Sequence, residues 1–450
     1  MIRDTVSDDM EKQGKASSWR QPLVEENLVE AAQAARHRAI ASVIEAQGRR
    51  IMVAFLGHDD YEKVEDIMPE PLAHLMLECI PAMVHELGGQ VAWSMRQYGR
   101  EVQNAILHTV KVAGQHRLIL HEGYLFIYLP DELVVVSADP DVKDGETVIK
   151  VGVRSSVSPT AFLEKWTRYA REHNYLRGQA FFADGAIIER NRRYGWDDIL
   201  LPEATKRTIR THVDSFLNNR LRLRELGVKM RRGLILAGPP GTGKTLLGKV
   251  LADTLNVSFL WVSPRHVRNA TSFQEIMSLA RFVAPVVLFL EDLDLFAEER
   301  EGNKWMGLGE LMNQLDGAVD NEDIVTIATT NRLDVIEKAL RNRPGRFDRI
   351  VEIGALDERC RRELFVKLLS RSSIGDGEMA HLISATTDYT GAQIEELTNT
   401  IYILAVDDEK AAVSGGGNEG GCITVDRQLI DRAVNEFRVE RKSRLGFHAA

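Results

Sequence analysis

The feature that most constrains this chain is a short apolar run that ends in glycines and passes directly into a helix-forming segment. Residues 233–237 read GLILA, followed by GPPGTGK over 238–244 and TLLGKVLA over 245–252. An apolar run of this length, bounded by turn residues, is typical of a buried parallel strand. Glycines between a strand and a helix let backbone N–H groups converge on one point. The pattern therefore predicts a strand–loop–helix unit that holds an anion.

The loop matches the phosphate-binding pattern GxxxxGK[S/T]. In this pattern the backbone cradles the phosphates, the lysine reaches the β and γ phosphates, and the hydroxyl ligates Mg²⁺. We predict ATP and Mg²⁺ as cofactors, bound by Gly238, Pro239, Pro240, Gly241, Thr242, Gly243, Lys244, Thr245 and Leu246. The alternative is a strand-to-helix turn that binds nothing, which would require the loop and both flanking elements to match by chance.

A second apolar run, PVVLFLEDLDLF over 285–296, ends in three acids. The pattern predicts another buried strand with Glu291 and Asp292 at its tip. We expect Glu291 to support Mg²⁺ together with Thr245, and Asp292 to act as the base that activates water. We expect Asp294 to cap the following helix or to support the site. The alternative is that the Glu-Asp order slows hydrolysis and leaves a nucleotide-dependent switch.

Strand and helix patterns alternate from the phosphate loop to residue 331, which favours a parallel sheet with helices on both faces. The predicted fold class is α/β, with a P-loop core followed by a helical lid and preceded by an α+β region. The predicted domains are a disordered tail over 1–18, the α+β region over 19–190, the core over 191–356, and the lid with a C-terminal tail over 357–450.

Five motifs in order resemble the AAA subfamily of AAA+ ATPases across residues 190–440. They are the phosphate loop, the acid pair, ELMNQLDG over 310–317, IATTNRLD over 327–334 and RPGRFDR over 343–349. The Glu-Asp order resembles the mitochondrial AAA ATPase that assembles respiratory complex III and some bacterial AAA proteins. The resemblance implies ATP hydrolysis by a homo-oligomeric ring, usually a hexamer, that remodels or disassembles protein cargo.

The resemblance also assigns roles to individual residues. Asn331 matches the position that orients the attacking water. Arg346 and Arg349 match the arginines that reach the nucleotide of a neighbouring subunit; a guanidinium suits that role because its charge is permanent and its fork fits phosphate oxygens. The remaining matches are expected beside the nucleotide: Asp198 and Ile199 in the linker, and Gly391 and Ala392 in the lid, where Asp388 replaces the family's usual glycine.

One departure from the family limits the mechanism. Residues 261–285 are shorter than the corresponding segment of threading motors and lack their aromatic–aliphatic–glycine triplet. Phe273, the only aromatic residue that could replace the triplet, is expected to face the core as the first apolar residue of a helix. A processive unfoldase is therefore disfavoured. A nucleic-acid motor is the other alternative, but only Arg265 and Arg268 offer it a basic surface.

Composition fits this interpretation. The net charge is −9 and no segment reaches the roughly 18 apolar residues of a membrane-spanning helix, so neither nucleic acid nor a membrane span is indicated. The polar start and the three scattered cysteines favour a cytoplasmic protein. Before residue 190 we expect helices over 23–50 and 70–108, an antiparallel sheet over 115–155, a helix from residue 158 and a hairpin at residues 184–185. The cargo is not indicated by the sequence.

Overall fold

The computed structural model describes most of the chain, namely residues 50, 53–57, 61–98, 101–112, 115–141, 146–154, 158–189, 192–267, 270–296, 314–315, 321–340, 347–413 and 423–446. These residues form two compact units that divide between Ala170 and Arg171. Several predictions lie outside the described residues, among them the tail over 1–18, the helix over 23–50 apart from its last residue, and the position of Arg346.

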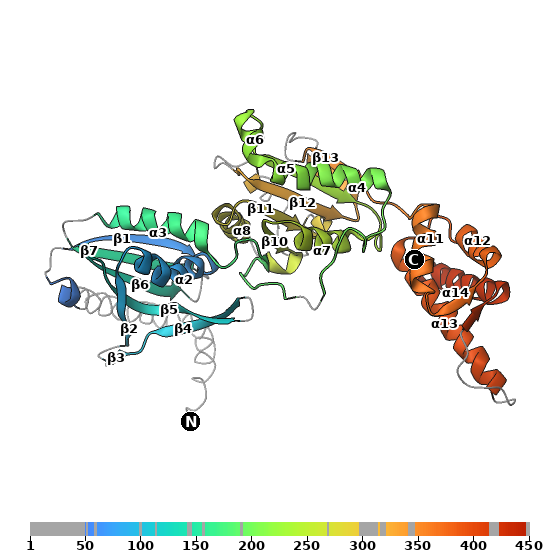
Figure 1. Ribbon diagram of the computed structural model, residues 1–450, viewed down its shortest axis with the longest axis horizontal. Coiled ribbons are helices and arrows are strands. Elements are labelled where there is room, and N and C mark those ends of the chain that lie inside the picture. Colours follow the sequence, from blue (N-terminus) through green and yellow to red (C-terminus); the bar gives the residue numbers. More distant parts are fainter. Residues whose placement is uncertain are drawn as a thin grey trace, which may run out of the picture. The chain divides into compact units, whose positions relative to one another are not determined.

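The first unit is built on a seven-stranded antiparallel sheet (Figure 1). Its strands follow the order β1-β7-β6-β5-β2-β3, and β4 pairs with β5. The bounds are β1 Tyr61–Pro69, β2 Gln90–Tyr98, β3 Glu101–Gln103, β4 Ile106–Val112, β5 Gln115–Tyr128, β6 Leu133–Asp141 and β7 Glu146–Arg154. The predicted antiparallel sheet over 115–155 is confirmed by β5, β6 and β7.

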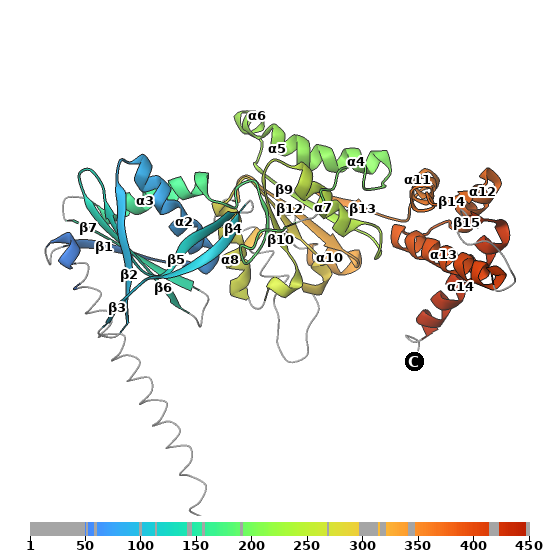
Figure 2. The ribbon, with the colours of Figure 1, turned by 60° about the horizontal axis from the view of Figure 1, so that its bottom comes forward.

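Among the described residues of this unit, two long helices are α2 (Glu70–Glu86) and α3 (Pro159–His173), and residues 53–56 are also helical. Helix α2 contacts β1, β2, β5 and β7, so it lies on one face of the sheet (Figure 2). Trp166 of α3 is fully buried, and its indole N–H donates to the carbonyl of Met76 at 2.7 Å. This hydrogen bond satisfies the polar end of a large apolar side chain and fastens α3 to α2.

The predicted helix over 70–108 is wrong beyond Glu86. Gly88, at φ +74°, ends the helix in the left-handed conformation that glycine adopts without cost. A Cβ at Gly89 would lie 2.3 Å from the carbonyl oxygen of Tyr128, so only glycine lets the chain pass β5 here. Residues 90–98 then pair with β5 as strand β2. Sheet pairing overrides the helix-like composition of this segment.

The second unit contains a six-stranded sheet in the order β13-β9-β12-β11-β10-β8, with every neighbouring pair parallel. The bounds are β8 Ala180–Phe182, β9 Arg231–Ala237, β10 Ser258–Val262, β11 Val286–Leu290, β12 Ile324–Thr330 and β13 Arg349–Glu352. This confirms the predicted α/β core. Strand β8 belongs to the sheet, so the sheet begins before residue 191, where the sequence placed the boundary of the core.

Helices alternate with these strands, and their apolar faces form one core with the sheet, including Leu236, Leu247, Phe259, Phe289 and Ile327. The bounds are α4 Glu203–Arg210, the π-helix η1 Thr211–Ser215, α5 Phe216–Asn218, α6 Arg220–Glu225, α7 Lys244–Thr254, the 3-10 helix η2 Pro264–His266, α8 Ala270–Phe282, the 3-10 helix η3 Leu293–Phe296 and α10 Leu333–Leu340. The hairpin predicted at residues 184–185 is present, since Phe181 pairs with Ile187 across a turn.

The C-terminal part of this unit is helical and has its own core, which includes Phe365, Leu382, Ile394, Leu397 and Ile430. The bounds are α11 Glu358–Leu368, β14 Ser372–Ile374, α12 Asp376–Ala385, α13 Gly391–Val413, β15 Ile423–Val425 and α14 Arg427–Gly446. Within the described part of the chain, no helix is both long and apolar enough to span a bilayer.

Candidate functional site

The phosphate loop runs from Gly238 to Thr245, between β9 and the start of α7. Gly241 and Gly243 have φ of +79° and +94°, a region that side chains rarely adopt. A Cβ at Gly238 would lie 2.0 Å from the carbonyl oxygen of Ile353, so that position also requires glycine. The glycines therefore fix a loop whose backbone curls around the N-terminus of α7, the geometry that binds phosphate.

Lys244 is the first residue of α7 and is 7% exposed. Its ammonium donates to the carbonyl oxygens of Gly238 and Pro239 at 2.6 and 2.9 Å. Burial lowers the pKa of Lys244, against the opposing charges of Asp292 and Asp294. The Lys244 side chain thus lies along the loop, with its ammonium group near the N-terminus of α7. Thr242 braces the same turn by donating to the carbonyl of Pro239 at 3.0 Å.

Glu291 follows β11 directly, and both of its carboxylate oxygens are hydrogen-bonded. The hydroxyl of Thr245 donates to Oε1 at 2.7 Å, and the indole N–H of Trp261 donates to Oε2 at 3.0 Å. Neighbouring oxygens in an octahedral Mg²⁺ shell lie about 2.9 Å apart, given metal–oxygen bonds of about 2.0–2.1 Å. The hydroxyl and the carboxylate therefore already have the spacing and the hard-oxygen chemistry that Mg²⁺ requires.

Asp292 adopts φ +52°, a left-handed conformation that is uncommon outside glycine. Its backbone N–H donates to the hydroxyl of Thr329 at 2.9 Å, which stabilises this turn. The amide of Asn331 donates to its carboxylate at 3.4 Å. Burial raises the pKa of Asp292, and the nearby charges of Glu291 and Asp294 raise it further. The structure thus brings together the predicted base and the predicted water-orienting amide.

Asp294, which the sequence predicted to cap the following helix or to support the site, has partners that the sequence did not reveal. It lies in η3, is 4% exposed, and accepts hydrogen bonds from the hydroxyl of Thr330 at 2.8 Å and the backbone N–H of Asn331 at 3.1 Å. Asp294 therefore fastens the end of β12, and with it Asn331, to the segment that carries Asp292. Trp261 was also missed, because a tryptophan inside an apolar strand gives no sign that its N–H meets a carboxylate.

The linker and lid residues that the sequence predicted beside the nucleotide differ in their contacts with the phosphate loop. The Cδ1 of Ile199 lies 3.8 Å from the position of a Cβ at Gly243, and the backbone N–H of Ala392, next to Gly391, donates to the carbonyl of Gly241 at 3.1 Å. Asp198 instead closes its own turn, with a carboxylate oxygen 2.8 Å from the backbone nitrogen of Gly195. That hydrogen bond is the main reason that its pKa lies below the ordinary value.

The backbone conformation of Asp388 shows how an aspartate can stand where the family usually has glycine. Its φ is +64°, the left-handed conformation that glycine would adopt freely and aspartate tolerates better than most residues. The turn that precedes α13 is therefore formed despite the substitution. The backbone carbonyl of Tyr389, next in the chain, accepts a hydrogen bond from Leu356 at 3.2 Å.

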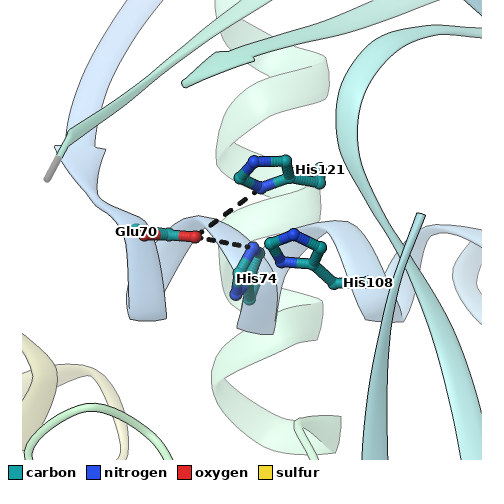
Figure 3. A group of neighbouring side chains, drawn as sticks. All are labelled: Glu70, His74, His108 and His121. Atoms are coloured by element: carbon teal, nitrogen blue, oxygen red, sulfur yellow. Dashed lines mark ion pairs between the residues drawn. The ribbon is translucent and has the colours of Figure 1, made fainter. Parts of the chain in front are cut away.

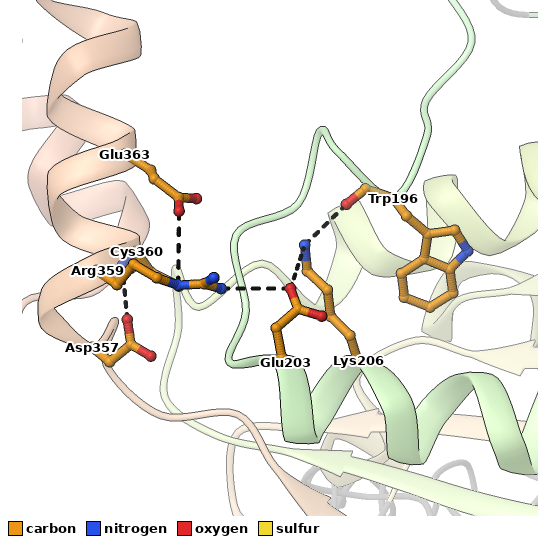
Figure 4. A network of polar contacts seen from close by, with 7 residues as sticks. All are labelled: Trp196, Glu203, Lys206, Asp357, Arg359, Cys360 and Glu363. Atoms are coloured by element: carbon orange, nitrogen blue, oxygen red, sulfur yellow. Dashed lines mark hydrogen bonds and ion pairs between the residues drawn. The ribbon is translucent and has the colours of Figure 1, made fainter.

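The linker helix α4 and the lid helix α11 are joined by a polar network (Figure 4). The guanidinium of Arg359 lies 3.5 Å from Glu203 of α4 and 3.7 Å from Glu363 of its own helix. Lys206 lies 3.9 Å from Glu203 and donates to the carbonyl of Trp196 at 3.2 Å. Exposed ion pairs stabilise a fold little, so this network records where linker and lid approach one another.

The arginine motif is described only in part. Arg349 is exposed at the start of β13, with a guanidinium nitrogen 3.3 Å from Nε2 of His212. It pairs in register with Leu234 of β9, whereas the residue that precedes the phosphate loop, Ala237, pairs with Glu352. Arg349 is thus three residues, about 10 Å of strand, back from the edge that carries the loop. Its side chain is not gathered around the phosphate loop of its own chain.

The shortened segment after β10 begins with η2. Phe273 is fully buried in α8, which confirms that it faces the core. The guanidinium of Arg265 lies 5.0 Å from the centre of the Phe182 ring and donates to His266 at 3.1 Å. Arg268 lies outside the described residues.

These features define a P-loop nucleotide-binding site: a glycine loop after β9, a lysine at a helix N-terminus, two acids after β11 and an amide after the neighbouring strand β12. Residues 234–355 match the family model described as ATPase family associated with various cellular activities (AAA). The chain therefore carries an ATPase domain of the AAA family.

Curated relatives agree with this assignment. The chain is 31% identical over 268 residues to the ATP-dependent zinc metalloprotease FtsH of Mesomycoplasma conjunctivae, covering 56% of this chain and 35% of FtsH. It is 32% identical over 234 residues to proteasome-activating nucleotidase 2 of Haloferax volcanii, covering 49% of this chain and 57% of that protein. The chain thus spans well under two thirds of either relative. The solved FIGL-1 AAA domain is 22% identical, with a TM-score of 0.46, and the match covers 55% of this chain and 85% of that domain.

Proposed function

We propose that this chain assembles into a ring, usually a hexamer in its family, that hydrolyses ATP to remodel or disassemble protein cargo. The observation that carries the proposal is the meeting of Asp292 and Asn331, 3.4 Å apart, beside the phosphate loop and the Thr245–Glu291 pair. Binding alone needs the loop and its lysine. A carboxylate and an amide that converge next to them are the groups that a hydrolase needs to position and deprotonate water.

The roles follow from the geometry. Thr245 and Glu291 would hold Mg²⁺, which when bound neutralises charge on the β and γ phosphates. The ammonium of Lys244 contacts phosphate oxygens in place of the two loop carbonyls that it now meets. Asp292 accepts the proton of the attacking water, and its raised pKa makes it a stronger base than an ordinary aspartate. Asn331 orients that water, and Asp294 holds Asn331 in place.

The proposed ring draws support from the position of Arg349, the described arginine of the motif. Arg349 lies three residues back from the loop edge of its own sheet, which is consistent with a role outside the nucleotide site of its own chain. We propose that Arg346 and Arg349 complete the site of the next subunit. Such arginines contribute about 10³–10⁵-fold to turnover in related phosphoryl transfer.

Mixing two inactive variants tests this arrangement. A Lys244→Ala copy binds nucleotide much more weakly but still offers its arginines, and an Arg346→Ala copy binds nucleotide but lacks the arginine. Each variant alone should be nearly inactive, and the mixture should regain part of the wild-type turnover. Arg222→Ala, which changes an exposed arginine on α6, is the matched control. A chain that stays monomeric and turns over ATP undiminished after Arg346→Ala contradicts the proposal.

Protein cargo is proposed in preference to nucleic acid. The two curated relatives are named as a metalloprotease and a proteasome-activating nucleotidase, both of which concern proteins. Arg265, one of the two basic residues available to a nucleic-acid motor, packs against Phe182. Steady-state ATPase assays with DNA, RNA and unfolded or folded proteins distinguish the possibilities. Stimulation by nucleic acid alone favours the motor, and nucleotide binding without sustained turnover favours the switch.

A further inference from the structure

Four side chains of the first unit converge in a cluster that the ATPase site does not involve (Figure 3). Glu70 and His74 lie on α2, His108 lies on β4 and His121 lies on β5. One potential ligand atom from each residue lies within 4.8 Å of the others. The cluster therefore joins one helix to a hairpin of the sheet.

The local structure explains why these residues meet. Glu70 and His74 are four residues apart on a helix and therefore share a face. In the β4–β5 pair, Leu107 is opposite Leu120 and Ile106 is opposite Glu122, so His121 occupies a bulge without a cross-strand partner. A bulge redirects a side chain and is retained at sites where that direction matters. Here it brings the ring of His121 onto that of His108, with ring centres 3.7 Å apart.

The nitrogens that face Glu70 lack partners. The nearest carboxylate oxygen of Glu70 lies 3.6 Å from Nε2 of His74 and 3.6 Å from Nδ1 of His121, beyond hydrogen-bond distance. Both nitrogens are buried, and among the described residues neither has a hydrogen-bond partner. Buried polar atoms are nearly always satisfied, so an unsatisfied pair aimed at one carboxylate points to a group that lies between them.

Burial favours the neutral form of the histidines in this cluster. Burial lowers the pKa of His74 to about 4, and burial together with His108 lowers the pKa of His121. A neutral imidazole keeps a lone pair on one nitrogen, which is the form that binds a metal.

We propose that Glu70, His74, His108 and His121 form a structural zinc site that fastens helix α2 to the β4–β5 hairpin. Three imidazoles and one carboxylate make a four-coordinate set that suits Zn²⁺, whereas Mg²⁺ and Ca²⁺ prefer oxygen ligands. Ligand atoms of a tetrahedral zinc site lie about 3.4 Å apart, given bonds of about 2.0–2.1 Å. Two of the pairs here, at 3.6 Å, are already close to that spacing.

The site closes its own coordination shell, because all four ligands come from the protein. Structural zinc sites have this property, whereas catalytic ones keep a position open for water. The two elements that it joins, α2 and the β4–β5 hairpin, otherwise meet mainly through β5. We therefore expect zinc to act on the stability of the first unit and to leave the chemistry at the phosphate loop unchanged.

The test uses the full-length chain without an affinity tag, stripped with EDTA and then exposed to zinc in the absence of nucleotide. The wild-type chain should retain about one zinc per chain after dialysis, and its cobalt derivative should show the intense visible bands of a tetrahedral site. His74→Ala and His121→Ala should each weaken zinc binding by at least about 10-fold. His85→Ala on α2 and His116→Ala on β5, both exposed, are matched controls.

Several results would overturn the proposal. The first is a wild-type chain that keeps no zinc. Another is binding of equal strength in the His74→Ala and His85→Ala variants. A third is a first unit whose thermal stability responds to pH but not to zinc, which would mean that the cluster binds protons and no metal. The cobalt spectrum of the wild-type chain needs no variant to fold, so the proposal stays testable if the substitutions disrupt the first unit.

Discussion

The polar cluster at the phosphate loop and the histidine cluster of the first unit differ in how their polar atoms are satisfied. At the phosphate loop, both carboxylate oxygens of Glu291 accept hydrogen bonds, and Asp294 accepts two more. In the first unit, His74 and His121 direct buried nitrogens at Glu70 without reaching it. The cluster at the phosphate loop is held in place by hydrogen bonds within the protein, so its ligand can bind reversibly. The second needs an added ligand to be complete.

The largest effect is expected at Lys244, the cation of the phosphate site. Lys244→Ala should weaken ATP binding by about 30-fold or more, because phosphate charge would be left without its buried partner. Equilibrium binding of a fluorescent ATP analogue measures this loss. Lys249→Ala, on the same helix beside Tyr194, should bind as the wild type does. Equal affinities in the two variants would show that the loop backbone alone binds the phosphates.

The histidine cluster should make the first unit sensitive to acid when zinc is absent. The pKa of His74 is about 4 in the fold and 6.5 in the unfolded chain, so the unfolded state binds more protons between these values. The contribution of His74 to the free energy of unfolding is therefore fully present above about pH 6.5. It is lost, by about 3 kcal/mol, as the pH drops toward 4. Urea unfolding in EDTA should show this slope, and it should be smaller in His74→Gln but not in His85→Gln.

Asp294 should matter for stability as well as for turnover. Asp294→Ala leaves the buried hydroxyl of Thr330 and the backbone N–H of Asn331 without their acceptor, which costs about 1–3 kcal/mol. Thermal unfolding measures the loss, and the maximal ATPase rate should fall because Asn331 is released. Asp334→Ala, an exposed change on α10, is the matched control. An unchanged melting temperature would mean that the end of β12 stays in place without Asp294.

The smallest effect is expected at Asp388, before the lid helix α13. Asp388→Gly should stabilise the protein slightly, by up to about 1 kcal/mol, because glycine adopts φ +64° without strain. Glu395→Gly, on the exposed face of α13, should instead destabilise it by a similar amount. Chemical denaturation of both variants checks the opposite signs. Destabilisation by Asp388→Gly would show that the aspartate side chain makes a contact that offsets its strain.

Much of the ATPase site could be predicted from the sequence because its parts are local. Glu291 and Asp292 follow one buried strand and Asn331 follows another, and the carboxyl ends of parallel strands meet at one edge of the sheet. The order of strands and motifs along the chain was therefore enough to place Glu291, Asp292 and Asn331 together. Trp261 and Asp294 could not be placed in this way, since their partners depend on side-chain direction between neighbouring strands.

The histidine cluster could not be predicted for a related reason. His108 and His121 are brought together by strand pairing and by a bulge, and neither leaves a spacing pattern in the sequence. The helix predicted over 70–108 placed His108 on the wrong kind of element. Local composition favoured a helix there, and the pairing of β2 and β4 with β5 overrode it.

The most direct test of the central claim is turnover by Asp292→Asn. The substitution keeps the shape of the side chain and the donor contact of Asn331 but removes the base. We predict that this variant binds ATP with nearly wild-type affinity and hydrolyses it about 10²–10⁴-fold more slowly in a single turnover. Hydrolysis of the bound ATP at the wild-type rate would contradict the account and place the base elsewhere.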